Sequence, residues 1–157
     1  MPTGLDERHA RGSEDDHAMR MVANELASKA TMIEAFQFKV YAHSGVAATL
    51  ARSQLRGHLA IQEGIADIPQ QAFMFAPEIT SITLPNSLVT VGEEAFYGCP
   101  KLFAVHIPDN CAQICSKAFY NTSLRTVSIP ATTLLIEQTG PVFPEACTVV
   151  VRETTMD

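Results

Sequence analysis

The chain has 157 residues, of which 46% are hydrophobic and 18% charged, so it can bury a core and is not disordered as a whole. Its formal net charge of -6 argues against nucleic acid or an anionic membrane as the main partner, because both require clustered lysine and arginine. No apolar run approaches the roughly 20 residues of a membrane-spanning helix, so no transmembrane segment is expected.

The N-terminal part of the chain is polar. Residues 1–12 show no hydrophobic periodicity and predict a disordered tail. They lack the apolar core of a secretory signal, and their acidic residues do not suit a transit peptide. We therefore expect a soluble, intracellular protein. A cell-surface location stays open if an upstream signal is missing from this chain.

Residues 13–57 predict a helical segment. Ser13 is followed by three acidic residues, which is typical of a helix start. Apolar residues then recur at helical spacing on one face: Met19, Val22, Leu26, Ala30, Ile33, Phe36 and Val40. After a break at Ser44-Gly45, a second short helix is predicted over about residues 46–55.

This helical face has two possible roles. It can cap the open end of the domain that follows, or it can dock onto another protein. In the second case, the docking residues would be Met19, Val22, Leu26, Ile33 and Phe36.

From His58 onward the sequence repeats itself with a period of about 23 residues. An Ala-Phe pair recurs at Ala72-Phe73, Ala95-Phe96 and Ala118-Phe119. Such self-similarity is typical of a solenoid, in which each unit is too small to bury its own apolar face. We therefore predict a solenoid over residues 58–153, followed by a tail at 154–157. The three phenylalanine rings should stack into one buried column.

Each unit also carries an apolar pair at alternate positions, which predicts a short strand with both side chains facing inward. The four pairs are Leu59/Ile61, Ile82/Leu84, Val105/Ile107 and Val127/Ile129. The positions between and just before these pairs then face outward in two rows of small or polar residues. The candidate partner-binding residues in these rows are Thr83, His106, Ser128, Ser81 and Thr126. The alternative is that the rows are merely solvated.

A further column directly follows the phenylalanines and consists of Met74, Tyr97 and Tyr120. Tyrosine is a favoured binding anchor, so Tyr97 and Tyr120 are additional candidates for partner binding. The alternative is partial burial of these rings against the neighbouring coil.

The repeated units resemble the BspA-like leucine-rich repeat. The best match is VGEEAFYGCPKLFAVHIPDNCAQI, residues 91–114, and the likeness covers about residues 59–153. The resemblance implies a curved, right-handed solenoid with short strands on one face. It also implies a role in adhesion, host-protein binding or scaffolding, without catalysis.

No chemical site emerges from the reactive side chains. The four cysteines form no CxxC pair and have no histidine pair nearby to complete a zinc site. We expect buried free thiols in a reducing compartment, and a disulfide from Cys99 to Cys115 or Cys147 stays open. His58 and His106 fall in different outward rows, and no nucleophile elbow or phosphate-binding loop is present. We predict no catalytic residue, cofactor or metal.

The expected fold class is α+β, with a leucine-rich-repeat solenoid of about four short coils behind an N-terminal helical segment. The expected function is a non-enzymatic protein–protein interaction module, acting as a structural or accessory subunit of a larger assembly. A surface adhesin or secreted host-binding factor of the BspA-like type is the alternative. A small hydrolase or metal enzyme built on the helical half is a third possibility.

Overall fold

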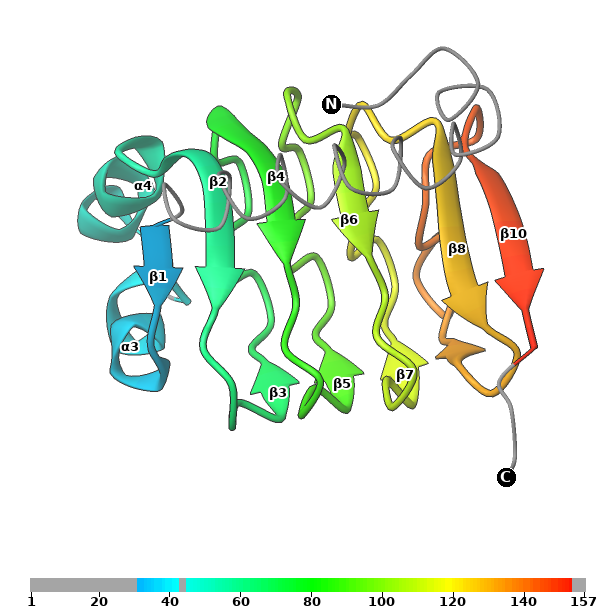
Figure 1. The fold of residues 1–157 in the computed structure, drawn as a ribbon. Helices are drawn as coiled ribbons and strands as arrows, with labels where there is room; N and C mark the ends of the chain where they lie inside the picture. Colours follow the sequence, from blue (N-terminus) through cyan, green and yellow to red (C-terminus); the bar gives the residue numbers. More distant parts are fainter. Residues whose placement is uncertain (1–30, 43–44, 154–157) are drawn as a thin grey trace, which may run out of the picture. The chain divides into compact units, whose positions relative to one another are not determined.

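Parallel strands stacked from coil to coil build the part of the chain described by the computed structural model, residues 31–42 and 45–153 (Figure 1). One sheet has the order β1-β2-β4-β6, and β8 and β10 form a two-stranded sheet beside it. These strands are β1 (Thr31–Ile33), β2 (Arg56–Ile61), β4 (Glu78–Thr83), β6 (Ala104–His106), β8 (Thr126–Pro130) and β10 (Thr148–Arg152).

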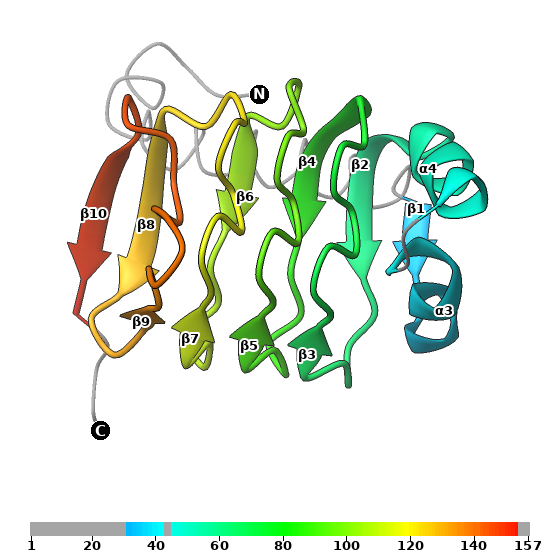
Figure 2. The same cartoon turned by 180° about the vertical axis from the view of Figure 1, so that it is seen from behind.

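A second sheet of two-residue strands runs along the lower edge of the coils in Figure 1, in the order β3-β5-β7-β9. Its strands are β3 (Asp67–Ile68), β5 (Thr90–Val91), β7 (Gln113–Ile114) and β9 (Leu134–Leu135). From each of these strands the chain returns through a turn segment on the side opposite the long strands (Figure 2). Each coil therefore has a strand face and a turn face. This solenoid of about four coils confirms the predicted architecture.

The apolar pairs explain why the strands form where they do. Both members of each pair are buried, except Val105, which is partly buried. Alternation along a strand places them on the inner face, while a proline after the pair ends the long strand in three coils. The inward orientation of the pairs is confirmed.

The phenylalanine column is confirmed as the centre of the core. Phe73, Phe96 and Phe119 are fully buried, and their ring centroids are 5.2 and 5.1 Å apart along the column. Phe143 adds a fourth ring, 5.6 Å from Phe119. Phe143 therefore continues the phenylalanine column, although Gly140-Pro141 is inserted before it. Rings at these separations attract one another beyond their burial of apolar area.

The prediction of one helix running through Ile33 to Val40 is wrong. Residues 31–33 form β1, which pairs in parallel with Leu59–Ile61 of β2. The first coil would otherwise leave the backbone donors and acceptors of β2 unpaired, and this non-local pairing overrides the helical spacing of the side chains.

The helices of the described residues are short: η1 (Ala35–Gln37), α3 (Phe38–Tyr41) and α4 (Val46–Ser53). The second predicted helix is confirmed as α4. None of them combines the length and apolar character that crossing a bilayer requires.

Side chains from α3 cover the N-terminal end of the phenylalanine column. The Phe38 ring meets Phe73 edge-on at 5.9 Å, and the Tyr41 ring lies 5.8 Å from Phe73. Arg52 of α4 is 3% exposed and donates a hydrogen bond to the Tyr41 carbonyl, which ties the two helices together.

Candidate interaction surface

The strand face brings most of the predicted partner-binding residues into two rows. Strand register aligns His58, Ser81 and Ala104 in one row. It aligns Ala60, Thr83 and His106 in the other row. On β8, Thr126 and Ser128 pair with Thr148 and Val150 of β10. Because β8 lies beside β6, the outward positions continue across the face (Figure 1).

His58 joins the two rows. Its Nδ1 lies 2.6 Å from the Ser81 hydroxyl, and its Nε2 lies 2.7 Å from the Thr83 hydroxyl. In the neutral ring one nitrogen donates and the other accepts, and each hydroxyl can take the complementary role. Partial burial lowers the pKa of His58, which favours this neutral form. The bridge therefore fixes three outward side chains before any partner arrives.

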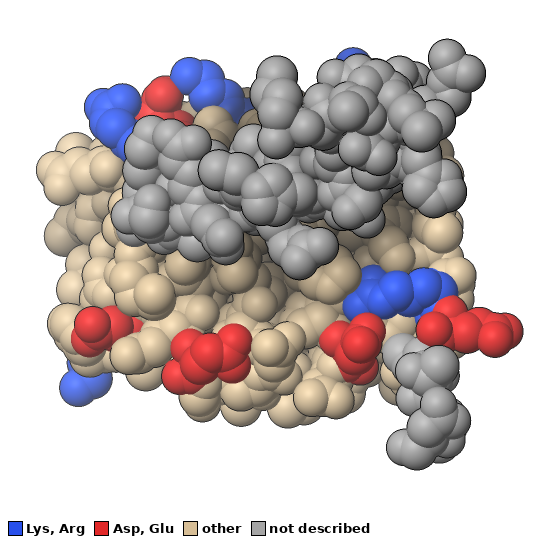
Figure 3. Space-filling view, viewed as in Figure 1, with Lys and Arg blue, Asp and Glu red and all other residues tan. Residues whose placement is uncertain are grey.

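The rows themselves contain no charged residue, whereas charges lie at the ends of the strands. Glu78 accepts from Lys101 at 2.9 Å near the start of the strands, with Arg56 at 3.8 Å. Asp109 pairs with Arg152 at 2.9 Å beyond their other end. Figure 3 shows charged side chains along the upper and lower borders of this face, in the part that the view leaves visible. The rows are thus a low-charge surface between two charged borders.

The tyrosine column lies on a different side of the solenoid. Tyr97 and Tyr120 belong to the turn segments opposite the strand face, and both are half-buried (Figure 2). Their rings stack on each other at 6.3 Å, and Phe75 meets Tyr97 edge-on at 5.5 Å. The structure does not bring the tyrosines together with Thr83 and His106, so one small partner segment cannot contact both groups.

The predicted helix docking face is not formed by the residues that the structure describes. Ile33 is fully buried in β1, whereas Phe36 of η1 is 64% exposed, so the two do not share a helical surface. Met19, Val22 and Leu26 lie outside the described residues.

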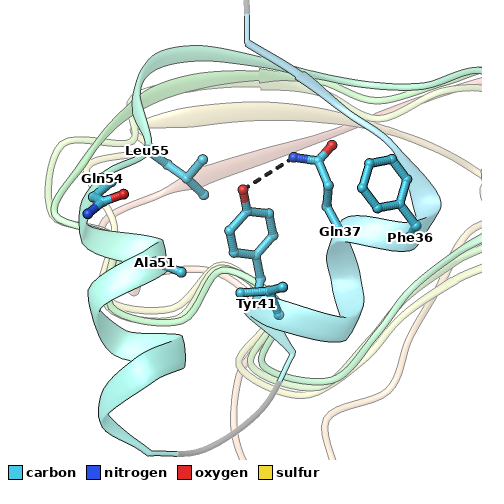
Figure 4. Close-up of a pocket in the computed structure, with 7 residues that line it drawn as sticks. Phe36, Gln37, Tyr41, Ala51, Gln54 and Leu55 are labelled. Atoms are coloured by element: carbon cyan, nitrogen blue, oxygen red, sulfur yellow. Dashed lines mark hydrogen bonds between the residues drawn. The ribbon is translucent and has the colours of Figure 1, made fainter.

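Phe36 instead borders a pocket of about 380 Å³ between η1, α3 and α4 (Figure 4). Gln37 crosses the pocket and donates a hydrogen bond to the Tyr41 hydroxyl at 3.3 Å. The lining residues are Phe36, Gln37, Val40, Tyr41, Ala51, Gln54 and Leu55. Such a lining suits an apolar side chain and contains no carboxylate or histidine for acid–base chemistry.

The cysteines offer little chemistry. All four are free, and neither of the possible disulfides is formed. Burial raises the pKa of Cys99 to about 12 and that of Cys111 to about 11, so both thiols stay protonated near neutral pH. Among the described residues, no cluster of three or more histidine, cysteine, aspartate or glutamate side chains could hold a metal ion.

Sequence reasoning identified the outward rows but missed the bridging role of His58. The signal was present, because Ser81 lies 23 residues and Thr83 25 residues after His58. One repeat step places Ser81 beside His58 on the next strand, and two more residues bring Thr83 to the same face.

Comparisons with known proteins concern the repeated part of the chain. Residues 55–140, more than half of the chain, match the family model described as BspA type Leucine rich repeat region (6 copies). A solved leucine-rich-repeat protein of T. pallidum is similar, with a TM-score of 0.49 and 22% identity. The match covers 60% of this chain and 51% of that one, so the chain spans about half the length of this relative. A search among curated proteins gives no significant match.

Proposed function

The chain belongs to the BspA-type leucine-rich-repeat family, whose repeats imply a binding role, and on this premise we propose that it is a non-enzymatic protein-interaction module. Its strand face is the binding surface, and it acts as a structural or accessory subunit of a larger protein assembly. The partner is a protein, and recognition depends on shape and hydrogen bonding without a covalent step.

The observation that carries this proposal is the alignment of Thr83 and His106 on neighbouring strands, with Thr83 held by His58. Both Thr83 and His106 are exposed. Short side chains on a rigid sheet lose little conformational entropy on binding, and a surface without charges costs little free energy to desolvate. Such a face can accept the backbone or the small side chains of a partner.

The state of the cysteines supports an intracellular location. Four free thiols are usual in a reducing compartment, whereas proteins of oxidising compartments commonly pair their cysteines. This supports an intracellular assembly over the alternative of a secreted or surface adhesin.

A quantitative capture experiment tests the proposal. Tagged wild-type protein is compared with a strand-face variant, Thr83→Glu/His106→Glu, in native extract. The matched control, Gln70→Glu/Asn121→Glu, adds the same charges at exposed positions outside the strand rows. Circular dichroism verifies that all three proteins are folded.

The proposal expects a protein that wild type and the control variant capture alike and that the strand-face variant loses by about tenfold or more, because a partner desolvates the added carboxylates. Equal capture by all three proteins would contradict it. Loss of the same protein only after Tyr97→Ala/Tyr120→Ala would instead assign binding to the tyrosine column.

A further inference from the structure

The last strand of the described residues, β10, presents an apolar edge. Within the described residues, β10 pairs only with β8 and ends the row of long strands (Figure 1). Val149 and Val151 lie in register with Val127 and Ile129, which are buried. Yet Val149, Val150 and Val151 are 37, 47 and 60% exposed. Three consecutive exposed valines on a strand with one open edge are a strong template for further strand pairing.

The hydrogen-bond pattern shows which backbone groups are open. Thr148 donates to Arg125 at 2.8 Å, and Arg152 accepts from Ala131 at 2.8 Å, so both residues direct their peptide groups toward β8. Peptide groups alternate in direction along a strand. The N–H and C=O groups of Val149 and Val151 therefore point to the open side.

This pattern is self-complementary. If two copies of β10 run antiparallel about a two-fold axis at Val150, then Val149 of each copy lies opposite Val151 of the other. A directly opposite pair of this kind exchanges two hydrogen bonds, so the two pairs together use all four open groups of each copy. Val150 then lies opposite Val150 of the other copy, in the closer, non-hydrogen-bonded type of pair.

The usual protection of such an edge is missing from β10. Exposed edge strands commonly carry lysine, proline or a bulge that discourages pairing, and residues 148–151 contain no charge and no proline. Arg152 is the charged residue of the strand, but its guanidinium turns back toward Asp109 and donates to the Ser128 carbonyl at 2.9 Å. The Arg152 guanidinium therefore does not lie along the open edge of β10, where its charge would discourage pairing.

We propose that β10 is a self-association site, at which two copies of this chain pair their β10 strands antiparallel about Val150 and form a continuous sheet. Pairing satisfies the open peptide groups and covers the valines. This proposal does not depend on what the strand face binds.

Cysteine scanning tests the register directly. The half-exposed native thiols are removed by Cys115→Ser and Cys147→Ser, and Val149→Cys, Val150→Cys and Val151→Cys are then made one at a time. At Val150 the two Cα atoms would lie about 4.5 Å apart, within the range that a disulfide spans. A cysteine at position 149 or 151 would instead lie opposite a valine of the other copy. Mild oxidation should therefore cross-link Val150→Cys much faster than its two neighbours. Equal rates at all three positions, or no cross-link at Val150, would overturn the proposal.

Analytical ultracentrifugation provides an independent measurement on chains without added cysteines. Wild type should form a concentration-dependent dimer, and Val151→Lys should weaken it by about tenfold or more because two lysines enter one interface. The control Val89→Lys places the same charge on an exposed valine directly before β5, away from β10, and should leave the dimer intact. The Val151 side chain is 60% exposed, so this variant should remain folded. A wild-type chain that is monomeric at every concentration would refute the dimer.

Discussion

At the residue scale, His58 shows how a single side chain organises the strand face. Its two ring nitrogens hold hydroxyl groups on the next strand, and its pKa is lowered by partial burial. The folded protein therefore binds a proton at this ring less readily than the unfolded chain does. The contribution of His58 to stability is full above the ordinary histidine pKa of 6.5 and is lost progressively as the pH falls below it.

We predict that His58→Gln reduces the loss of stability on acidification. The glutamine side chain can keep a hydrogen bond to a neighbouring hydroxyl but does not titrate. Thermal unfolding is measured on both sides of pH 6.5, with His106→Gln as the control on the same face. An unchanged acid dependence in His58→Gln would show that the ring does not couple to folding.

Residue-scale features also mark a limit of sequence reasoning. Phe75, Gly98 and Asn121 occupy the same position in successive coils, and their φ angles are 60°, 73° and 58°. Glycine is the usual residue for this left-handed conformation, but only one coil uses it. The shared turn geometry could not be read from residue type, because the neighbouring coils impose it on Phe75 and Asn121.

At the element scale, the phenylalanine column connects the coils. Phe96 lies between Phe73 and Phe119 and is fully buried. We predict that Phe96→Ala destabilises the protein by about 3–5 kcal/mol, since it removes a buried ring and leaves a cavity between two others. The exposed Phe103, 62% accessible, is the matched control, and Phe103→Ala should change stability by about 0.5 kcal/mol or less. Urea unfolding measures both variants, and equal effects would contradict the stacked core.

Arg152 plays a corresponding role for the last strand. Its guanidinium donates to the carbonyls of Ile107 and Ser128 and pairs with Asp109, so it joins β10 to the two preceding long-strand segments. The exposed ion pair contributes little, whereas the bonds to carbonyl groups contribute more.

We predict that Arg152→Ala loosens β10 locally by about 1–3 kcal/mol while the remaining coils stay folded. Hydrogen exchange should accelerate at the β10 amides that bond to β8. Arg125→Ala, at an exposed arginine before β8, is the control and should leave those amides protected. Uniform acceleration across all coils would contradict a local role.

At the scale of the whole molecule, the repeat period predicted the coils because successive 23-residue units contact one another in register. The residues of the apolar pairs and the Ala-Phe pairs could therefore be placed from the sequence. The N-terminal part could not, because β1 has only three residues, too few to show alternation, and pairing with a distant strand decides its conformation.

The candidate interaction surface was likewise predictable in part. The outward rows follow from strand alternation, so Thr83 and His106 were correctly placed on one face. The contacts of Arg152 could not be predicted, since its partner Asp109 lies 43 residues earlier in the chain. The separation of the tyrosines from the strand face also depends on the path of the turn segments.

Site-specific photo-cross-linking in native extract tests most directly whether the strand face binds a protein. A photoreactive amino acid replaces Thr83 or His106 on the strand face, Asn121 on the turn segments, or Phe36 at the N-terminal pocket. We predict that Thr83 and His106 cross-link to the same protein, and that Asn121 and Phe36 do not. Cross-links to that protein from Asn121 or Phe36 alone would contradict the assignment of the strand face as the interface.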